Sequence, residues 1–332
     1  MDINILLDLT IRFLYYIIGT EYLGVRTKGI RPEIGRNDMA RYNLDMAGIQ
    51  WEISSPVKFD PDEKMSPFLV KGEKTDIRLS FQIGDPEFSG NIVWERFPKV
   101  RKEGTRYWVE RTLAVRTKPS GCICLNPNDL TKVEGWIYPD HVDDIKSLES
   151  MMDISELEIL LTQFDTFSLH SSFIRWKGHG ILFTAPSGTG KSTQADIWEA
   201  TRDAQQLNGD RSMVRWEKGT WTAYGSPFAG SSGIYKNESA PIGAIVVLRQ
   251  AGENTLTVLN PSEAFRLLYS ETVIPKWYPK AHEKIIQLVM KLASEIPVVM
   301  LQCLPDESAV EELEQYLNTL DSFQNGRAMN GR

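Results

Sequence analysis

A glycine-rich segment between an apolar run and an amphipathic run limits the fold of this chain more than any other feature. The segment is Ala185–Thr193, with the sequence APSGTGKST. It follows Ile181–Thr184, whose mainly apolar side chains predict a buried strand, and it precedes residues 192–201, whose spacing predicts an amphipathic helix. A strand, a tight turn and a helix in this order predict an α/β unit with the loop at the helix N-terminus.

The residue types in this segment suit the binding of phosphate groups. Gly188 and Gly190 let the backbone curl so that N–H groups point inward, and the helix N-terminus adds partial positive charge. Lys191 supplies a full positive charge, and Ser192 a hydroxyl for Mg²⁺. The pattern is the Walker motif G-x-x-x-x-G-K-[ST], with Ala185 in place of the first glycine. A plain glycine turn would not explain the lysine and the hydroxyl. The sequence therefore predicts a site for ATP and Mg²⁺ formed by Ser187, Gly188, Thr189, Gly190, Lys191, Ser192 and Thr193.

Phosphoryl transfer also needs a carboxylate near the metal and, for a hydroxyl acceptor, a base. No apolar strand in the sequence ends directly in Asp. Asp210 follows Leu207–Gly209, and Asp306 follows the apolar run Pro297–Leu304 after one proline. Spacing alone leaves both carboxylates open. Asn-Gly-Asp is also typical of a turn, so a structural role for Asp210 is the alternative.

The order of these residues is similar to that in the catalytic domain of HPr kinase/phosphorylase, which is related to ATP-dependent phosphoenolpyruvate carboxykinase. The matching features are Leu169-His170, a short strand, Gly178, the phosphate loop and Asp210. Downstream, residues 225–230, 242–248 and 262–268 resemble the wider group of HPr-kinase-like proteins. The resemblance spans about residues 155–320. It implies an ATP- and Mg²⁺-dependent kinase that transfers the γ-phosphate to a serine-type hydroxyl of a protein, peptide or small molecule.

The resemblance also implies roles for single residues. Asp210 inherits a place near the attacking hydroxyl and the metal, with Ser192 as the second metal ligand, and His170 matches a histidine before the first strand. Arg211 stands where the family has a second aspartate, so a candidate ligand or base is lost and a cation is gained. That cation either neutralises the transferring group or lies solvated at the surface. The implied catalytic residues are Asp210, His170, Lys191 and Arg211. For His170, hydrogen bonding to backbone in a purely structural role is the alternative.

Two other functions stay open. The first is a regulatory module that binds ATP without transferring phosphate, which Arg211 and the absence of a conventional metal-binding strand favour. The second is a carboxykinase-type enzyme acting on a small carboxylic acid, which needs a second metal site and an arginine cluster that the sequence does not show. The loss of the second aspartate and of the family's downstream signature puts reversible phosphorolysis in doubt.

The pattern of the chain predicts a mixed α/β (α+β) fold in two domains. Residues 1–150 form a β-rich domain for substrate recognition or oligomerisation, with alternating runs at 48–54 and 76–83 and a further candidate strand at 107–115. Residues 151–320 form the phosphate-loop domain, and residues 321–332 a flexible tail. In the second domain we expect a helix over 155–164 capped by Ser155, a short strand at Phe173–Trp176, a hairpin turn at Lys218-Gly219 and helices over 262–268, 279–295 and 308–320.

Charge and cysteine content limit the kinds of partner and environment that suit this chain. The 332 residues carry a formal net charge of −7, which argues against general binding of nucleic acid or anionic membranes. Three cysteines give no disulfide framework and fit a reducing cytoplasm, and Cys122 and Cys124 have no second pair to complete a zinc site. The apolar run Ile3–Ile18 is too short and too charged to span a bilayer, so it predicts an amphipathic helix. Self-association is an expectation from the resemblance alone.

Overall fold

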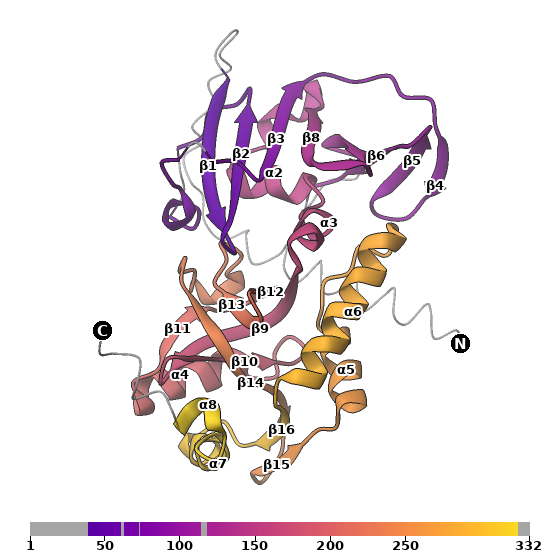
Figure 1. The fold of residues 1–332 in the computed structure, drawn as a ribbon. Coiled ribbons are helices and arrows are strands. Elements are labelled where there is room, and N and C mark those ends of the chain that lie inside the picture. The colour runs from indigo at the N-terminus through magenta and orange to yellow at the C-terminus, as the bar shows by residue number, and fades with distance from the viewer. Residues whose placement is uncertain (1–38, 61–62, 73, 114–117, 325–332) are drawn as a thin grey trace. The chain divides into compact units, whose positions relative to one another are not determined.

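A computed structural model describes residues 39–60, 63–72, 74–113 and 118–324. The amphipathic helix predicted for residues 3–18 lies outside the described residues. The chain divides into two compact units, which Figure 1 shows as a ribbon. The described residues of the first unit are 39–42, 52–60, 78–113 and 118–155, and those of the second are 43–51, 63–72, 74–77 and 156–324.

The N-terminal half is rich in strands, in the order β1-β2-β3-β8-β7-β6-β5-β4 within one sheet. Their bounds are β1 Ala40–Met46, β2 Ile49–Ser55, β3 Ile77–Ile83, β4 Asn91–Trp94, β5 Lys99–Glu103, β6 Arg106–Arg111, β7 Gly121–Asn126 and β8 Asp129–Ile137, followed by helix α2 Leu148–Ile154. The strands predicted at 48–54 and 76–83 are confirmed, because strict alternation of apolar and polar residues marks a half-buried strand.

The second unit combines a sheet with helices, so the mixed α/β class is confirmed. Its sheet runs β10-β9-β12-β13-β14-β16-β15, with β11 against β9 and a further parallel pairing of β10 with β14. The strands are β9 Thr166–Trp176, β10 His179–Thr184, β11 Gln205–Asn208, β12 Arg211–Glu217, β13 Thr220–Tyr224, β14 Ser239–Gln250, β15 Thr255–Val258 and β16 Val298–Cys303. The helices are α3 Leu157–Leu161, α4 Lys191–Arg202, α5 Pro261–Ser270, α6 Pro279–Glu295, α7 Glu307–Leu317 and α8 Asp321–Gln324. None of the described helices is long and apolar enough to cross a bilayer.

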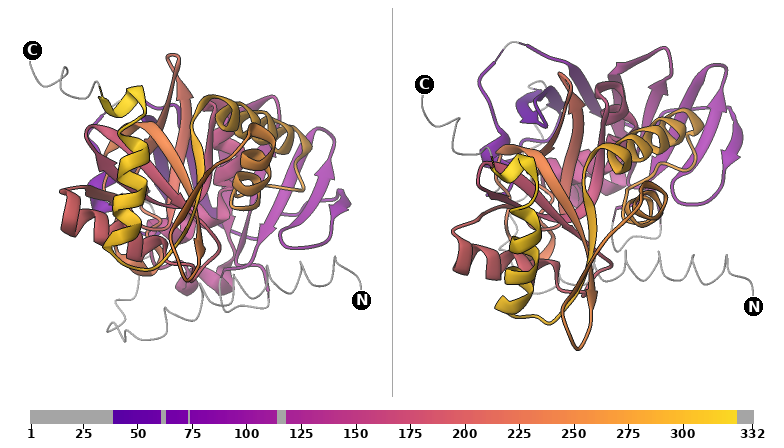
Figure 2. Two further views of the ribbon diagram at one scale, coloured as in Figure 1. Left: turned by 90° about the horizontal axis from the view of Figure 1, so that it is seen from below. Right: turned by 60° about the horizontal axis from the view of Figure 1, so that its bottom comes forward.

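Helices cover both faces of this sheet. Leu182 of β10 joins the core beneath α5 and α6, whereas its neighbours Ile181 and Phe183 join the core beneath α4 and α7. Successive side chains of a strand point to opposite faces, so a strand with helices on both sides is apolar throughout. Figure 2 shows the yellow α7 and the orange α6 on opposite sides of the strands. The phosphate-loop strand β10 therefore lies in the middle of three layers.

Strand β9 lies between β10 and β12, and its partners differ along each edge: β12 and then β11 on one, the segment after α5 and then β10 on the other. Its residues 166–170 pair with β12, where His170 faces Arg211, and its residues 171–176 pair with β10, where Ser171 faces Thr184. On the edge away from β12, Leu169 forms an isolated antiparallel bridge with Thr272, just beyond α5. The change of partner places His170 where β9, β10, β12 and the end of α5 meet.

Three sequence predictions need correction. The helix expected over 155–164 is broken: Ser155 ends α2, Glu156 takes a left-handed conformation with φ 57°, and α3 begins only at Leu157. The strand expected at Phe173–Trp176 is the last part of the much longer β9. In the predicted tail, residues 321–324 form the helical turn α8, because Phe323 is buried against Trp176 at a ring-centre distance of 5.6 Å.

Elsewhere in the second unit, the turn and helix predicted from local sequence patterns are confirmed. Lys218 and Gly219 both have positive φ, 51° and 82°, and they connect β12 to β13 in the predicted hairpin. Helix α6 has the predicted bounds. Helix α5 begins after Asn260, whose side chain caps it together with Glu263.

Candidate active site

The segment between β10 and α4 forms a tight loop at a helix N-terminus, as the sequence predicts. Gly188 has φ 78° and Gly190 has φ 110°, conformations that other residues rarely adopt. A Cβ atom added at either glycine would meet no described atom within 4 Å, so backbone conformation and not crowding accounts for the glycines. The Lys191 side chain is buried, and its Nζ donates a hydrogen bond to the carbonyl of Ala185 at 2.9 Å. Lys191 is thus held against the loop backbone, while the loop residues Ser187 and Gly188 are exposed.

A pocket of about 470 Å³ borders this loop. Its walls come from the loop, the carboxyl end of β14 and the last turn of α5. Gln250, at the end of β14, donates from Nε2 to the carbonyls of Gly188 and Thr189 at 3.3 and 3.5 Å and so steadies the tip of the loop. The lining residues are Ala185, Pro186, Ser187, Gly188, Thr189, Val247, Leu248, Arg249, Gln250, Leu267, Ser270 and Glu271. The loop therefore has room beside it for a ligand.

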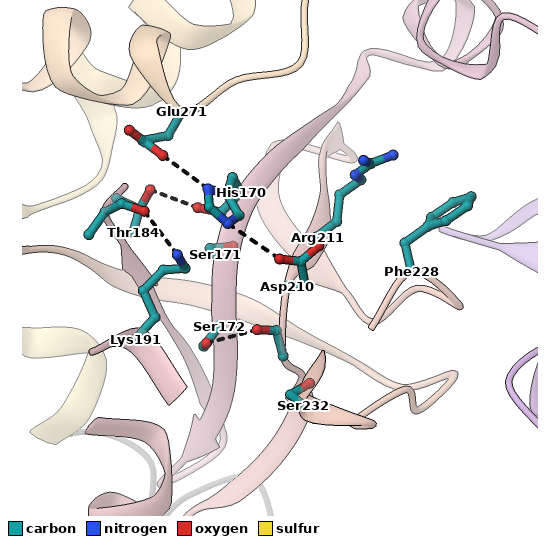
Figure 3. A network of polar contacts seen from close by, with 12 residues as sticks. His170, Ser171, Ser172, Thr184, Lys191, Asp210, Arg211, Phe228, Ser232 and Glu271 are labelled. Carbon is teal, nitrogen blue, oxygen red and sulfur yellow. Dashed lines mark hydrogen bonds and ion pairs between the residues drawn. The ribbon is translucent and has the colours of Figure 1, made fainter. Parts of the chain in front are cut away.

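The side chain of His170 lies between two carboxylates (Figure 3). Its Nε2 is 3.3 Å from Oδ1 of Asp210, and its Nδ1 is 3.1 Å from Oε2 of Glu271. Thr184, the last residue of β10, donates from Oγ1 to the carbonyl of His170 at 2.9 Å. Figure 3 shows Lys191 reaching up beside this group from the start of α4. The structure thus brings together three of the sequence-predicted residues, His170, Asp210 and Lys191.

The charges in this cluster shift one another's pKa. Burial alone would lower the pKa of His170, but the hydrogen bonds with Asp210 and Glu271 raise it overall. Burial would raise the pKa of Asp210, but the hydrogen bond and charge of His170 lower it, with further help from nearby Arg211 and Lys191. Burial lowers the pKa of Lys191, against the opposing charges of Asp210 and Glu271. Strongly coupled groups of this kind are common in catalytic sites.

Arg211 takes a different direction from Asp210. Its guanidinium carbon lies 5.2 Å from the centre of the Phe228 ring. Its charge opposes the rise that burial causes in the pKa of Glu158. Figure 3 shows the Arg211 side chain extending away from Lys191. The guanidinium is therefore not gathered with the other sequence-predicted catalytic residues, and a role on the transferring group stays a prediction.

The turn before β12 leaves the Asp210 carboxylate available. Asn208, which is buried, accepts hydrogen bonds at its Oδ1 from the backbone N–H groups of Asp210 and Arg211 at 3.1 and 2.8 Å. Asn208 therefore makes the turn, and Asp210 is free to face His170. Gly230 packs closely here, because a Cβ at this position would come within 2.8 Å of Cγ of Asp210.

The structure distinguishes Asp210 from Asp306, the two carboxylates that spacing leaves as candidates for the position near the metal. Asp306 is the N-cap of α7, where its Oδ1 accepts from the N–H of Ser308 at 3.0 Å. This contact gives Asp306 a structural role. Asp210 is the carboxylate that lies beside the loop lysine, close enough to perturb its pKa.

Two polar residues of this region have no signal in the sequence. Glu271 follows α5 and belongs to no motif, and Gln250 ends a strand that is otherwise read by its apolar run. Both reach the site through tertiary folding. Among the described residues, no group of three or more His, Cys, Asp and Glu side chains is arranged to hold a metal ion.

Comparison with known proteins places the chain in a family. The model of a family described as "ScmC: SynChlorMet cassette protein ScmC" matches residues 137–318, which is more than half of the chain. The chain belongs to the ScmC family. The region that matches the ScmC model includes the phosphate loop, His170, Asp210 and Glu271.

Other comparisons add less. No curated protein matches the chain. Among solved structures, the chain is similar to one titled "Structure of the Hpr(Ser) kinase/phosphatase from Coxiella burnetii", with 11% sequence identity and a TM-score of 0.28. The match covers 46% of this chain and 97% of that one.

Proposed function

We propose that this ScmC protein is an ATP- and Mg²⁺-dependent phosphotransferase that acts on a serine-type hydroxyl group. The observation that carries the proposal is the meeting of Lys191, His170 and Asp210 beside an open phosphate loop. A glycine loop alone would suit many ligands. A loop that adjoins a carboxylate held by a histidine supplies both an anion site and a group that accepts a proton.

Different residues of this chain bind the phosphates and accept the proton during transfer. Lys191 and the loop N–H groups hold the phosphates, which requires the lysine to leave the carbonyl of Ala185. Asp210, oriented by His170, accepts the proton of the acceptor hydroxyl. At the same time the oxygen of that hydroxyl forms a bond to the γ-phosphorus. The bond from that phosphorus to the bridging oxygen of ADP breaks, and ADP keeps the electron pair.

The residues present fit a Mg²⁺ ion that arrives with the nucleotide. This ion usually keeps several waters and takes one or two protein ligands together with phosphate oxygens, so no ready-made metal cage is needed. The Ser192 side chain is exposed at the loop exit and makes no hydrogen bond within the part of the chain that the structure describes. Ser192 and Asp210 would hold the ion, which supplies charge neutralisation on the phosphates.

Two substitutions test this function. Lys191→Ala should abolish binding of a fluorescent ADP analogue. Asp210→Asn should leave that affinity, measured without Mg²⁺, within about threefold, and should slow Mg²⁺-dependent phosphate transfer roughly 10²–10⁴-fold, the usual contribution of a general base. Transfer is followed with γ-labelled ATP, Mg²⁺ and three acceptors in parallel: a library of serine-containing peptides, free serine and water. Asp203→Asn is the matched control, because Asp203 is exposed at the end of α4.

Each result separates the candidates. Transfer at the native rate by Asp210→Asn would remove Asp210 from the mechanism. Binding of nucleotide with no transfer to any acceptor would favour the regulatory module instead. Absence of nucleotide binding by the unmodified protein would refute the proposal.

A further inference from the structure

Glu271 is tied to His170 by its backbone as well as by its side chain. The two residues are 101 positions apart in the sequence. The N–H of His170 donates to the carbonyl of Glu271 at 2.9 Å, and the N–H of Val273 donates to the carbonyl of Ser168 at 3.1 Å. The segment after α5 is therefore fixed alongside β9 by main-chain bonds that do not depend on the Glu271 side chain.

The carboxylate of Glu271 has one hydrogen-bond partner among the described residues, and its charge also acts on the nearby Lys191. Its Oε2 lies 3.1 Å from Nδ1 of His170, and within the described residues it makes no other hydrogen bond or ion pair. The Glu271 side chain is 13% exposed, and the residue borders the pocket beside the phosphate loop. Glu271 ends α5 as its C-cap, but through its backbone N–H and not its side chain. Because the partly buried carboxylate forms no salt bridge to Lys or Arg among the described residues, its position needs another explanation.

The histidine ring needs an anchor if it is to orient Asp210. Rotation about the bond between Cβ and the ring is broad, so the side chain alone does not fix where Nε2 points. A hydrogen bond at Nδ1 fixes that direction, as a third group does in nucleophile–base arrangements. Glu271 provides this bond on the side of the ring away from Asp210 (Figure 3).

We infer that Glu271 is a positioning residue for phosphate transfer, which acts through His170 to hold the Asp210 carboxylate in place. The inference rests on the proposed function. It assigns Glu271 no contact with the nucleotide. It therefore predicts an effect on the rate of transfer and not on the binding of ATP, and an effect that exists only while His170 is present.

A double-mutant cycle with Glu271→Ala and His170→Gln tests the inference. Transfer of label from γ-labelled ATP to the best acceptor, or to water, gives kcat and KM, and a fluorescent ADP analogue gives affinity. Glu271→Ala should lower kcat about tenfold to a hundredfold, the usual cost of losing a group that orients a functional residue, with KM for ATP within threefold. In the His170→Gln background, Glu271→Ala should cost less than threefold more.

Two further variants separate positioning from general damage. Glu271→Gln has the same size and keeps an oxygen that accepts from Nδ1, so it should recover most of the lost rate. Glu283→Gln is the control, because Glu283 is exposed on α6, and it should match the unmodified protein in rate and melting temperature.

Several outcomes would overturn the inference. These are a native rate in Glu271→Ala, an equal loss in both backgrounds, a rate for Glu271→Gln as low as that of Glu271→Ala, or a loss of nucleotide affinity. Failure of the proposed function is distinguishable, because it appears in the unmodified protein as absent binding or absent transfer. Failure of the inference appears only in the variants.

Discussion

Replacing Gly188 by alanine tests two effects of the left-handed backbone in the phosphate loop, one on the stability of the protein and one on nucleotide binding. Gly188 has φ 78°, and a Cβ there would meet no described atom within 4 Å. The cost to the free protein is therefore conformational. A left-handed conformation costs an L-residue roughly 1–2 kcal/mol. In a unit of this size each kcal/mol lowers the melting temperature by about 2–4 °C, so Gly188→Ala should melt about 2–8 °C lower.

Gly188→Ala should also weaken nucleotide binding, as an effect separate from the loss of stability. Alanine favours negative φ, and any shift of the exposed loop in that direction turns a backbone N–H away from the phosphates. One hydrogen bond to a charged group is worth about 1.5–3 kcal/mol, so affinity for a fluorescent ADP analogue should fall about tenfold to a hundredfold. Gly219→Ala is the matched control, because Gly219 has φ 82°, is equally open and lies in the β12–β13 hairpin. If both variants bind nucleotide like the unmodified protein, or both lose affinity equally, the reasoning is wrong.

Three smaller predictions concern the supports of the site. Asn260→Ala removes both side-chain bonds that cap α5 and should lower the free energy of unfolding by about 1 kcal/mol, measured by urea unfolding. Gln250→Ala removes two neutral bonds to the loop tip and should weaken ADP-analogue binding about twofold to tenfold. Because the folded pKa of His170 is raised, its stabilising contribution is fully present below the unfolded pKa of about 6.5 and is lost as pH rises through the folded pKa. Urea midpoints should therefore fall from pH 6 towards pH 8.5, and this fall should be smaller in His170→Gln.

Local chemistry explains what the sequence predicted correctly. The phosphate loop, the Lys218-Gly219 hairpin and α6 each depend on neighbouring residues: glycines with positive φ, a proline at a helix start and an apolar face of regular spacing. Such signals are complete within about 10–20 residues of chain. They identified Lys191 and the strand before it without any tertiary information.

Predictions failed where buried polar groups hide the pattern. The part of β9 before Phe173 contains Ser168, Ser171 and Ser172, all fully buried, so it lacks the apolar run that marks the end of the strand. Glu156 in a left-handed conformation breaks a segment whose spacing is helical. Glu271 reaches His170 across 101 positions, and no periodicity within a single element reports such a contact.

The change of partner in β9 explains why one histidine reaches several parts of the site. Five residue pairs join β9 to β12 and end at His170, and six pairs join it to β10 and begin at Ser171. A slip of one residue in either ladder would turn the side chains of that strand to the opposite face. The two ladders therefore fix the position of His170. Its side chain points towards Asp210, just before β12, and its main-chain carbonyl accepts a hydrogen bond from Thr184 at the end of β10. Both ladders contain buried apolar residues, Phe167 and Leu169 in the first and Phe173 and Ile174 in the second. The packing of the core therefore supports the arrangement of the site.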